Sequence, residues 1–224
     1  MMEIKSKFLE AVQNGDIEMV TQYLEQHPEL INTRADNGRS AVLLAAYYAH
    51  PAIAALLANQ RSDLDIFEAC AAGDLERVKV LIEDHPELVD AVALDGFQPL
   101  GLACFFGHYE IARLLVEAGA EINSASKNPQ KVTPLHSAAA SRSLEIARLL
   151  LEHGADPNAR QNDDFTALHE AAHNGQIELV EILLAHGADV NANQKPGITA
   201  LSFAQQAGHQ DVAEFLLQHG AIRQ

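Results

Sequence analysis

His169, Glu170 and His173 form the segment of this sequence whose residue types and spacing most suggest chemistry. They read His-Glu-Ala-Ala-His, and on a helix the two histidines, four residues apart, lie on one face. Zinc hydrolases hold their metal with this spacing and use the glutamate as a general base. A catalytic zinc needs a third protein ligand, and the equivalent places 33 residues later hold only Ser202 and Gln206. A zinc-dependent hydrolase built on residues 169–173 is therefore kept as an alternative, and we predict neither a catalytic residue nor a metal site.

The first of these histidines, His169, belongs to a four-residue motif that recurs every 33 residues. Thr133–His136 reads Thr-Pro-Leu-His, and it returns as Thr-Ala-Leu-His at Thr166–His169 and as Thr-Ala-Leu-Ser at Thr199–Ser202. A fixed period of this size indicates a repeat architecture. Because His136 occupies the same place with no zinc motif around it, the repeat accounts for His169 without a metal.

Each copy of the repeat predicts two helices. Threonine before a proline or alanine is a good helix start. Leu135, Ala138 and Ala139 fall at i, i+3 and i+4, which gives one apolar stripe, and a second stripe follows at Ile146 and Leu150. A glycine then ends the second helix, since it tolerates the left-handed conformation. One helix pair cannot bury its own apolar face, so the pairs must stack.

The repeated unit Thr-Pro-Leu-His-x-Ala-Ala, continued by Glu-Ile-x-x-Leu-Leu-x-x-Gly-Ala-Asp-x-Asn, resembles the ankyrin repeat. The match is closest in residues 133–158 and 166–191, and weaker copies extend it over nearly the whole chain. Aligning the glycines that end the first helices gives seven units, two of them atypical terminal caps, which start near residues 6, 40, 64, 98, 133, 166 and 199. Two units carry Ala49 and Arg142 in place of that glycine. The resemblance implies an all-α solenoid of stacked helix pairs with short β-hairpin fingers, in a single elongated domain over residues 1–224.

Two loops depart from the repeat. The first half of the chain contains a duplication with an offset of 58 residues, which is two units minus about one loop. The missing loop falls near residues 59–65, and the resemblance implies that it is one of the hairpin fingers. A small-molecule pocket at the missing finger is a further alternative. The finger over residues 123–132 has instead two extra residues and carries Lys127 and Lys131.

Aromatic residues are concentrated at places off the predicted core stripe. The two places before the helix-ending glycine lie about 140° and 240° around the helix from the leucine of the motif. In the ankyrin family these places, and the residue before the threonine place, form the concave surface that contacts partners. The predicted partner-binding residues are Arg39, Tyr47, Tyr48, Phe97, Phe105, Phe106, Phe165, His173 and Asn174. Aromatic side chains are enriched at interface hot spots; the alternative is that the rings pack over neighbouring helices.

Other repeating polar residues are given structural roles. His153, His186 and His219 recur 33 residues apart, and we expect them to complement the negative ends of helices. Cys70 and Cys104 take equivalent places in adjacent units, where helix spacings of about 8–10 Å exceed the reach of a disulfide. We predict buried thiols, which fit a reducing cytoplasmic location.

Charge and composition narrow the class of function. The 224-residue chain has a formal net charge of −16, and its Lys and Arg residues are too few and too scattered to follow a phosphate backbone. No apolar run is long enough to span a membrane, and the N-terminal residues lack the apolar core of a secretory signal.

The sequence therefore favours a non-catalytic protein-protein interaction module: a scaffold, an adaptor or an inhibitory subunit. We expect no cofactor, no nucleic acid and no membrane among its ligands. Because the surface is acidic, a protein partner of basic character is expected. The sequence leaves the oligomeric state open, with a monomer as the expectation.

Overall fold

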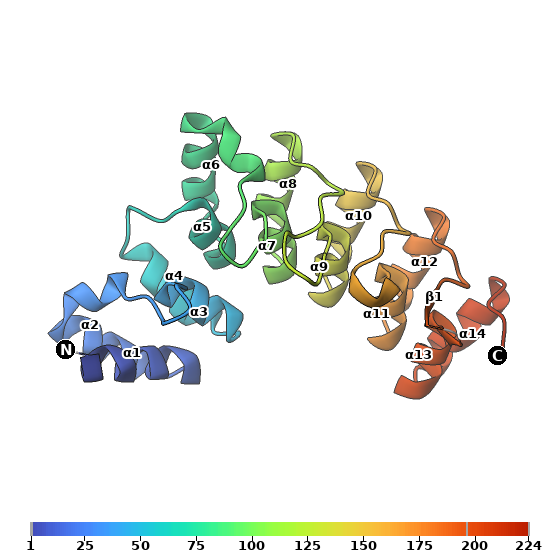
Figure 1. The fold of residues 1–224 in the computed structure, drawn as a ribbon, viewed down its shortest axis with the longest axis horizontal. Coiled ribbons are helices and arrows are strands. Elements are labelled where there is room, and N and C mark those ends of the chain that lie inside the picture. Colours follow the sequence, from blue (N-terminus) through green and yellow to red (C-terminus); the bar gives the residue numbers. More distant parts are fainter. Residues whose placement is uncertain (1, 196, 224) are drawn as a thin grey trace. The chain divides into compact units, whose positions relative to one another are not determined.

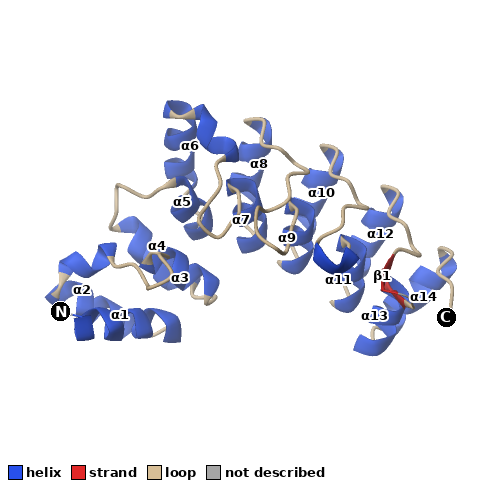
Figure 2. Cartoon of the chain, in the orientation of Figure 1, coloured by secondary structure: helices blue, strands red, loops and turns tan. Residues whose placement is uncertain are grey.

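The computed structural model describes residues 2–195 and 197–223. Over these residues the chain forms fourteen α-helices, three short 3-10 helices and one pair of strands, drawn by element in Figure 1 and by type in Figure 2. The chain divides into two compact units, Met1–Leu88 and Val89–Gln224, and each is described by itself. Across the described residues, no helix is both long enough and apolar enough to cross a bilayer.

The first unit contains three helix pairs. They are α1 (Met2–Asn14) with α2 (Ile17–Gln26), α3 (Ala41–Tyr47) with α4 (Pro51–Asn59), and α5 (Ile66–Ala72) with α6 (Leu75–Asp84). The 3-10 helices η1 (Pro28–Asn32) and η2 (Pro86–Asp90) follow α2 and α6. The core of this unit is apolar, with Phe8, Leu57 and Ile66 almost completely buried between the pairs.

The second unit contains four helix pairs. They are α7 (Pro99–Phe106) with α8 (Tyr109–Glu117), α9 (Pro134–Ala140) with α10 (Leu144–Glu152), α11 (Ala167–His173) with α12 (Ile177–Ala185), and α13 (Ala200–Ala207) with α14 (Gln210–Gln218). The first helices of successive pairs pack on one another, and so do the second helices, which makes two layers (Figure 1). The remaining elements are η3 (Asn162–Asp164), β1 (Asn193–Lys195) and β2 (Ile198–Thr199).

The predicted all-α fold of seven helix pairs is confirmed. Thr133, Thr166 and Thr199 stand at helix N-caps, as the repeated motif indicates. The paired alanines, such as Ala138 and Ala139, are fully buried, and their small side chains let successive first helices pack closely. The first pair begins earlier than predicted, because α1 starts at Met2 instead of near residue 6. That residues 1–224 form a single elongated domain stays a prediction.

The predicted loss of one finger is also confirmed. Only six residues, 60–65, separate α4 from α5. An ion pair occupies this connection, with Arg61 Nη1 2.9 Å from Glu68 Oε1 and both side chains buried. Among the described fingers, that of residues 193–199 alone forms paired strands. The first finger is closed by an isolated bridge between Arg34 and Ser40.

Candidate functional site

His136 and His169 each join the start of a first helix to the following finger. The Nε2–H of His136 donates to the carbonyl oxygen of Phe165 at 3.1 Å, and the Nε2–H of His169 donates to that of Ala192 at 3.0 Å. In both rings Nδ1 lies 2.8 Å from the hydroxyl of the threonine three residues earlier. Burial lowers the pKa of His136 to about 4 and also lowers the pKa of His169. The predicted structural role of these histidines is confirmed.

The contacts of the His-Glu-Ala-Ala-His segment do not favour a zinc site. Nδ1 of His169 accepts a hydrogen bond from the backbone N–H of Thr166 at 3.1 Å, so both ring nitrogens are occupied. One carboxylate oxygen of Glu170 accepts from Nδ2 of Asn174 at 2.8 Å, and His173 is exposed. Over the described residues, no group of three histidine, cysteine, aspartate or glutamate side chains could hold a metal ion. These contacts fit a structural role for His169 and a surface position for His173.

The gap left by the missing finger is filled by charged side chains. Arg61 is 7 % exposed and pairs with both Asp63 and Glu68 at 2.9 Å. Glu68 in turn completes the capping box at the start of α5 with Asp65. These contacts support a structural replacement for the finger and give no support to a small-molecule site there.

Three of the predicted partner-binding residues lie in the first unit, around the end of α3 and the finger before it. The guanidinium carbon of Arg39 lies 4.4 Å from the centroid of the Tyr47 ring, which is a cation–π contact. Tyr48, the next residue, is 50 % exposed. Tyr48 thus lies off the core, as its angle around the helix predicts, while Tyr47 is half-buried.

In the second unit, Phe97, Phe105 and Phe106 lie around α7. Phe105 is 40 % exposed, and its ring meets that of Phe106 edge-on with centroids 5.1 Å apart. Phe97 and Phe106 are half-buried. The two interpretations of the aromatic residues thus apply to different rings: most of the Phe106 surface is buried by packing, whereas Phe105 is 40 % exposed to solvent.

Phe165 belongs to a second aromatic cluster, which includes a residue that the sequence argument missed. Its ring stacks on that of His169 at 5.3 Å and meets Phe203 edge-on at 5.4 Å. Phe203 also lies edge-on to His173, with centroids 5.8 Å apart. The 33-residue period could have identified Phe203. It occupies the same repeat position as Ser137 and Glu170, directly after the histidine position.

A pocket of 130 Å³ opens beside Phe105 in the second unit. Its walls include Phe97, Phe105, Val132, Ser137, Gln161 and Glu170. These residues come from three fingers and from the first helices α7, α9 and α11, so the pocket crosses three repeats. The buried hydroxyl of Ser137 has no hydrogen-bond partner among the described residues.

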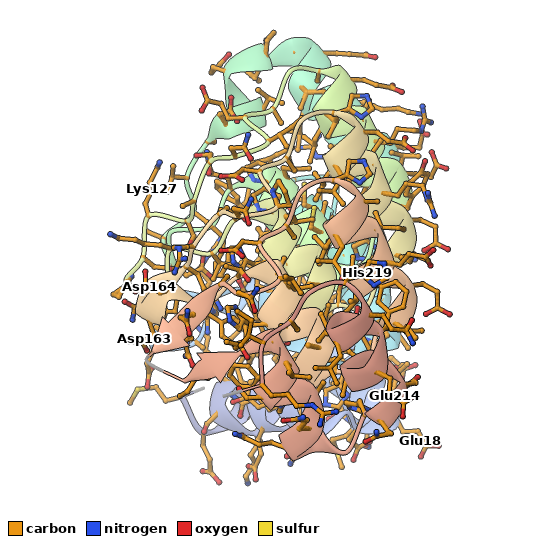
Figure 3. All side chains as sticks on the ribbon, turned by 90° about the vertical axis from the view of Figure 1, so that its right-hand side faces the viewer. Glu18, Lys127, Asp163, Asp164, Glu214 and His219 are labelled. Atoms are coloured by element: carbon orange, nitrogen blue, oxygen red, sulfur yellow. The ribbon has the colours of Figure 1, made fainter. Side chains whose placement is uncertain are left out.

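Charged side chains project from the finger side of the second unit. Figure 3 shows Lys127, Asp163 and Asp164 on the side formed by the fingers, and Glu214 on the opposite side. Three finger residues, Phe97, Val132 and Gln161, also line the pocket.

The remaining predicted residues have structural contacts. Nδ1 of each of His153, His186 and His219 lies 2.8–2.9 Å from the backbone carbonyl four residues earlier, at the end of a second helix. Their predicted place at helix C-termini is confirmed. Cys70 and Cys104 are not joined in a disulfide and have no exposed surface, and burial raises the pKa of Cys104.

Comparisons with known proteins agree with the repeat geometry. A family model described as ankyrin repeats (3 copies) matches residues 66–161 and 159–223. The chain is 23 % identical over 148 residues to the target of rapamycin complex 2 subunit AVO2 of Saccharomyces cerevisiae, which covers 61 % of this chain and 34 % of that protein.

Shorter matches cover smaller parts of two other proteins. The chain is 40 % identical over 57 residues to BTB/POZ domain-containing protein 3 of Schizosaccharomyces pombe, covering 25 % of this chain and 11 % of that protein. It is 38 % identical over 64 residues to the acyl-CoA-binding domain-containing protein 6 homolog of Dictyostelium discoideum, covering 29 % and 22 %. The chain thus spans about a third or less of the curated relatives it matches.

Proposed function

Because this chain belongs to the ankyrin repeat family, we propose that it is a non-catalytic binding module that acts as a scaffold, an adaptor or an inhibitory subunit. Ankyrin repeats are protein–protein interaction modules. One relative is by name a subunit of a complex, which supports a role in assembly. The observation that carries the proposal is the exposed ring of Phe105 beside a pocket that crosses three repeats.

The proposed contact surface consists of residues at the ends of first helices and at the fingers. They are Arg39, Tyr47, Tyr48, Phe97, Phe105, Phe106, Phe165, His173 and Asn174. Exposed aromatic side chains on a protein surface usually mark contact sites. Tyr48 at 50 % and Phe105 at 40 % exposure support this use.

The expected partner is a protein of basic character. A formal net charge of −16 favours encounter with a positively charged surface and disfavours nucleic acid. The two buried cysteines, which form no disulfide, agree with a reducing, cytoplasmic setting, and a monomer is the expected state of the chain.

The test replaces the rings of Phe105 and Phe106 in the full chain. Immobilised wild-type protein, Phe105→Ala/Phe106→Ala and Tyr109→Ala are compared for capture of proteins from a lysate of the source organism. Tyr109 is an equally exposed aromatic on a second helix and serves as the matched control. Truncating a hot-spot aromatic costs about 2 kcal/mol or more, so capture by the double variant should fall at least about tenfold.

Thermal unfolding of the same variants separates binding from packing. Since Phe106 is half-buried, a modest loss of stability accompanies the double substitution. If capture is unchanged while the melting temperature falls, the rings serve packing alone and the proposed surface is wrong.

A further inference from the structure

The side-chain hydroxyl of Ser137, in the second unit, is buried without a hydrogen-bond partner among the described residues. The residue lines the pocket beside Phe105 and is 1 % exposed. A desolvated hydroxyl without a partner costs about 1–3 kcal/mol. The oxygen itself has almost no accessible surface, so a hydrogen-bonding group supplied from outside the chain reaches it when the Ser137 side chain turns toward the pocket.

The dimensions of the pocket suit one side chain. Its 130 Å³ is well below the roughly 300–1,000 Å³ of a typical small-molecule site. Phe97 and Phe105 provide aromatic walls, and Val132 and Ala140 provide aliphatic ones. The occupant needs a slender apolar stem and a polar end that reaches Ser137.

Glu170 gives the pocket a negative charge. Asn174, one turn later on the same face, donates to its Oε1 at 2.8 Å and holds the carboxylate in place. His136, the other titratable lining residue, carries no charge at neutral pH because burial lowers its pKa to about 4. Arg160, next to the lining Gln161, donates to backbone carbonyls of the fingers at 3.1 and 3.5 Å, and Lys131, next to Val132, is exposed.

We propose that this pocket binds a lysine side chain of the protein partner, with the ammonium donating to Glu170 and to Ser137 Oγ. The stem lies between Phe97 and Phe105, whose ring faces attract a cation. The inference rests on the proposed protein-binding function and specifies the chemistry of one contact within it.

Lysine fits these groups better than arginine or a neutral side chain does. A guanidinium pairs best with both oxygens of a carboxylate at once, and Asn174 already engages one oxygen of Glu170. An ammonium is a compact charge with three donors, so it can bond one oxygen of Glu170 and Ser137 together. A neutral aliphatic side chain leaves both groups desolvated and unpaired.

Side-chain analogues test this assignment on the full chain by NMR. The probes are n-butylammonium, n-butylguanidinium and n-butanol, with the backbone amides of Ser137 and Glu170 as reporters. n-Butylammonium should shift these amides and bind at least about tenfold more tightly than n-butanol, a difference of about 1.4 kcal/mol. Glu170→Gln should weaken n-butylammonium about tenfold. Ser137→Ala should weaken it several-fold without lowering stability, because it removes an unpaired hydroxyl.

Glu178→Gln is the matched control, since Glu178 is an exposed carboxylate on the neighbouring helix α12. It should leave the titration unchanged. Three results with the wild-type chain would overturn the inference: n-butanol binding as tightly as n-butylammonium, n-butylguanidinium binding more tightly, or the absence of any shift at the pocket amides. An unchanged titration in Glu170→Gln would do the same.

The capture experiment separates this inference from the proposed function. If Glu170→Gln retains every captured protein while Phe105→Ala/Phe106→Ala loses them, the surface binds proteins and the lysine assignment falls. If both variants retain every captured protein, the proposed contact surface is wrong; if the wild-type chain captures no protein, the proposed function itself falls.

Discussion

At the scale of single residues, His136 stabilises the fold only while its ring is neutral. Its Nε2–H donates to the Phe165 carbonyl, and Nδ1 faces the Thr133 hydroxyl. Protonation would place a positive charge in a site that is 4 % exposed, with His169 close enough to lower its pKa further. The folded chain therefore resists the proton that the unfolded chain accepts.

This difference predicts a specific loss of stability in acid. The pKa of His136 is about 4 in the folded protein and 6.5 as the ordinary value, so its contribution is complete above pH 6.5. As the pH falls from 6.5 towards 4, the unfolded state binds the proton first, and about 3 kcal/mol is lost. His136→Gln has no such proton to bind and should lose about 3 kcal/mol less than the wild type over this range, measured by urea unfolding at each pH.

His85→Gln provides the baseline, because its side chain is 61 % exposed. Its stability should follow the wild-type pH curve, including the part due to the carboxylates. Parallel curves for wild type and His136→Gln would show that the buried ring is not the source of the acid sensitivity.

At the scale of elements, the turn between the two helices of a pair is where neighbouring pairs meet. Gly175 has φ 67°, and a Cβ added there would lie 2.5 Å from the His209 ring. Nε2–H of His209 donates to the carbonyl of His173 at 3.1 Å, so the ring is held over the glycine. Gly107 has a similar φ of 76° with nothing within 4 Å of the added Cβ. The turn therefore requires glycine at Gly107 for its positive φ alone. At Gly175 it requires glycine for its positive φ and for the space taken by the His209 ring.

Alanine at these two glycines should have unequal effects. Gly107→Ala suffers only the left-handed backbone penalty, about 1–2 kcal/mol. Gly175→Ala adds a steric clash with the neighbouring helix pair, worth a further 1–3 kcal/mol or so. Urea unfolding measures both, and Gly175→Ala/His209→Ala should recover part of the second term. Equal losses for the two single variants would show that His209 moves aside without penalty.

The period of the sequence makes the elements predictable, because the length of every helix pair and loop can be compared with the same 33-residue repeat. The missing finger was found in this way, as a shortfall in length. The period carries no information on backbone angles. It therefore could not predict that Ala49 and Arg142 adopt φ 60° and 58° and form the turn between the two helices of a pair without glycine. Positive φ is uncommon for residues other than glycine, and nothing local in the sequence marks it.

The candidate site was predictable only in part. Helical angles place Phe105 and Tyr48 off the core, and both are exposed. The pocket is different, because three fingers and three helices of separate repeats build it. Ser137 and Glu170 both line it because successive pairs pack on each other, and no spacing within one repeat encodes the shape of a pocket between repeats.

At the scale of the whole molecule, a repeat protein is cooperative only as far as neighbouring units are joined. In the second unit a row of asparagines makes such joints. Nδ2 of Asn123, Asn158 and Asn191 donates to the backbone carbonyls of Gly154, Gly187 and Gly220, respectively, at 2.9–3.0 Å. The amide oxygen of each accepts a backbone N–H two residues beyond the same glycine, at 2.7–3.0 Å. Each asparagine thus joins the base of its finger to the segment that follows the next second helix.

Asn158→Ala should weaken the coupling at one place in this row. Two hydrogen bonds are lost, each worth about 1 kcal/mol net, so the expected loss is roughly 2 kcal/mol. Because each pair contacts only its neighbours, the helices α11 to α14 should then unfold more independently of those before them. The urea transition should broaden, with a smaller slope, and amide hydrogen exchange should accelerate in α13 and α14 more than in α7.

Asn162→Ala is the control, because Asn162 is an exposed asparagine on the same finger. It should change neither the slope of the urea transition nor the exchange rates. An unchanged slope with uniformly faster exchange would mean that helix packing alone transmits cooperativity between the pairs.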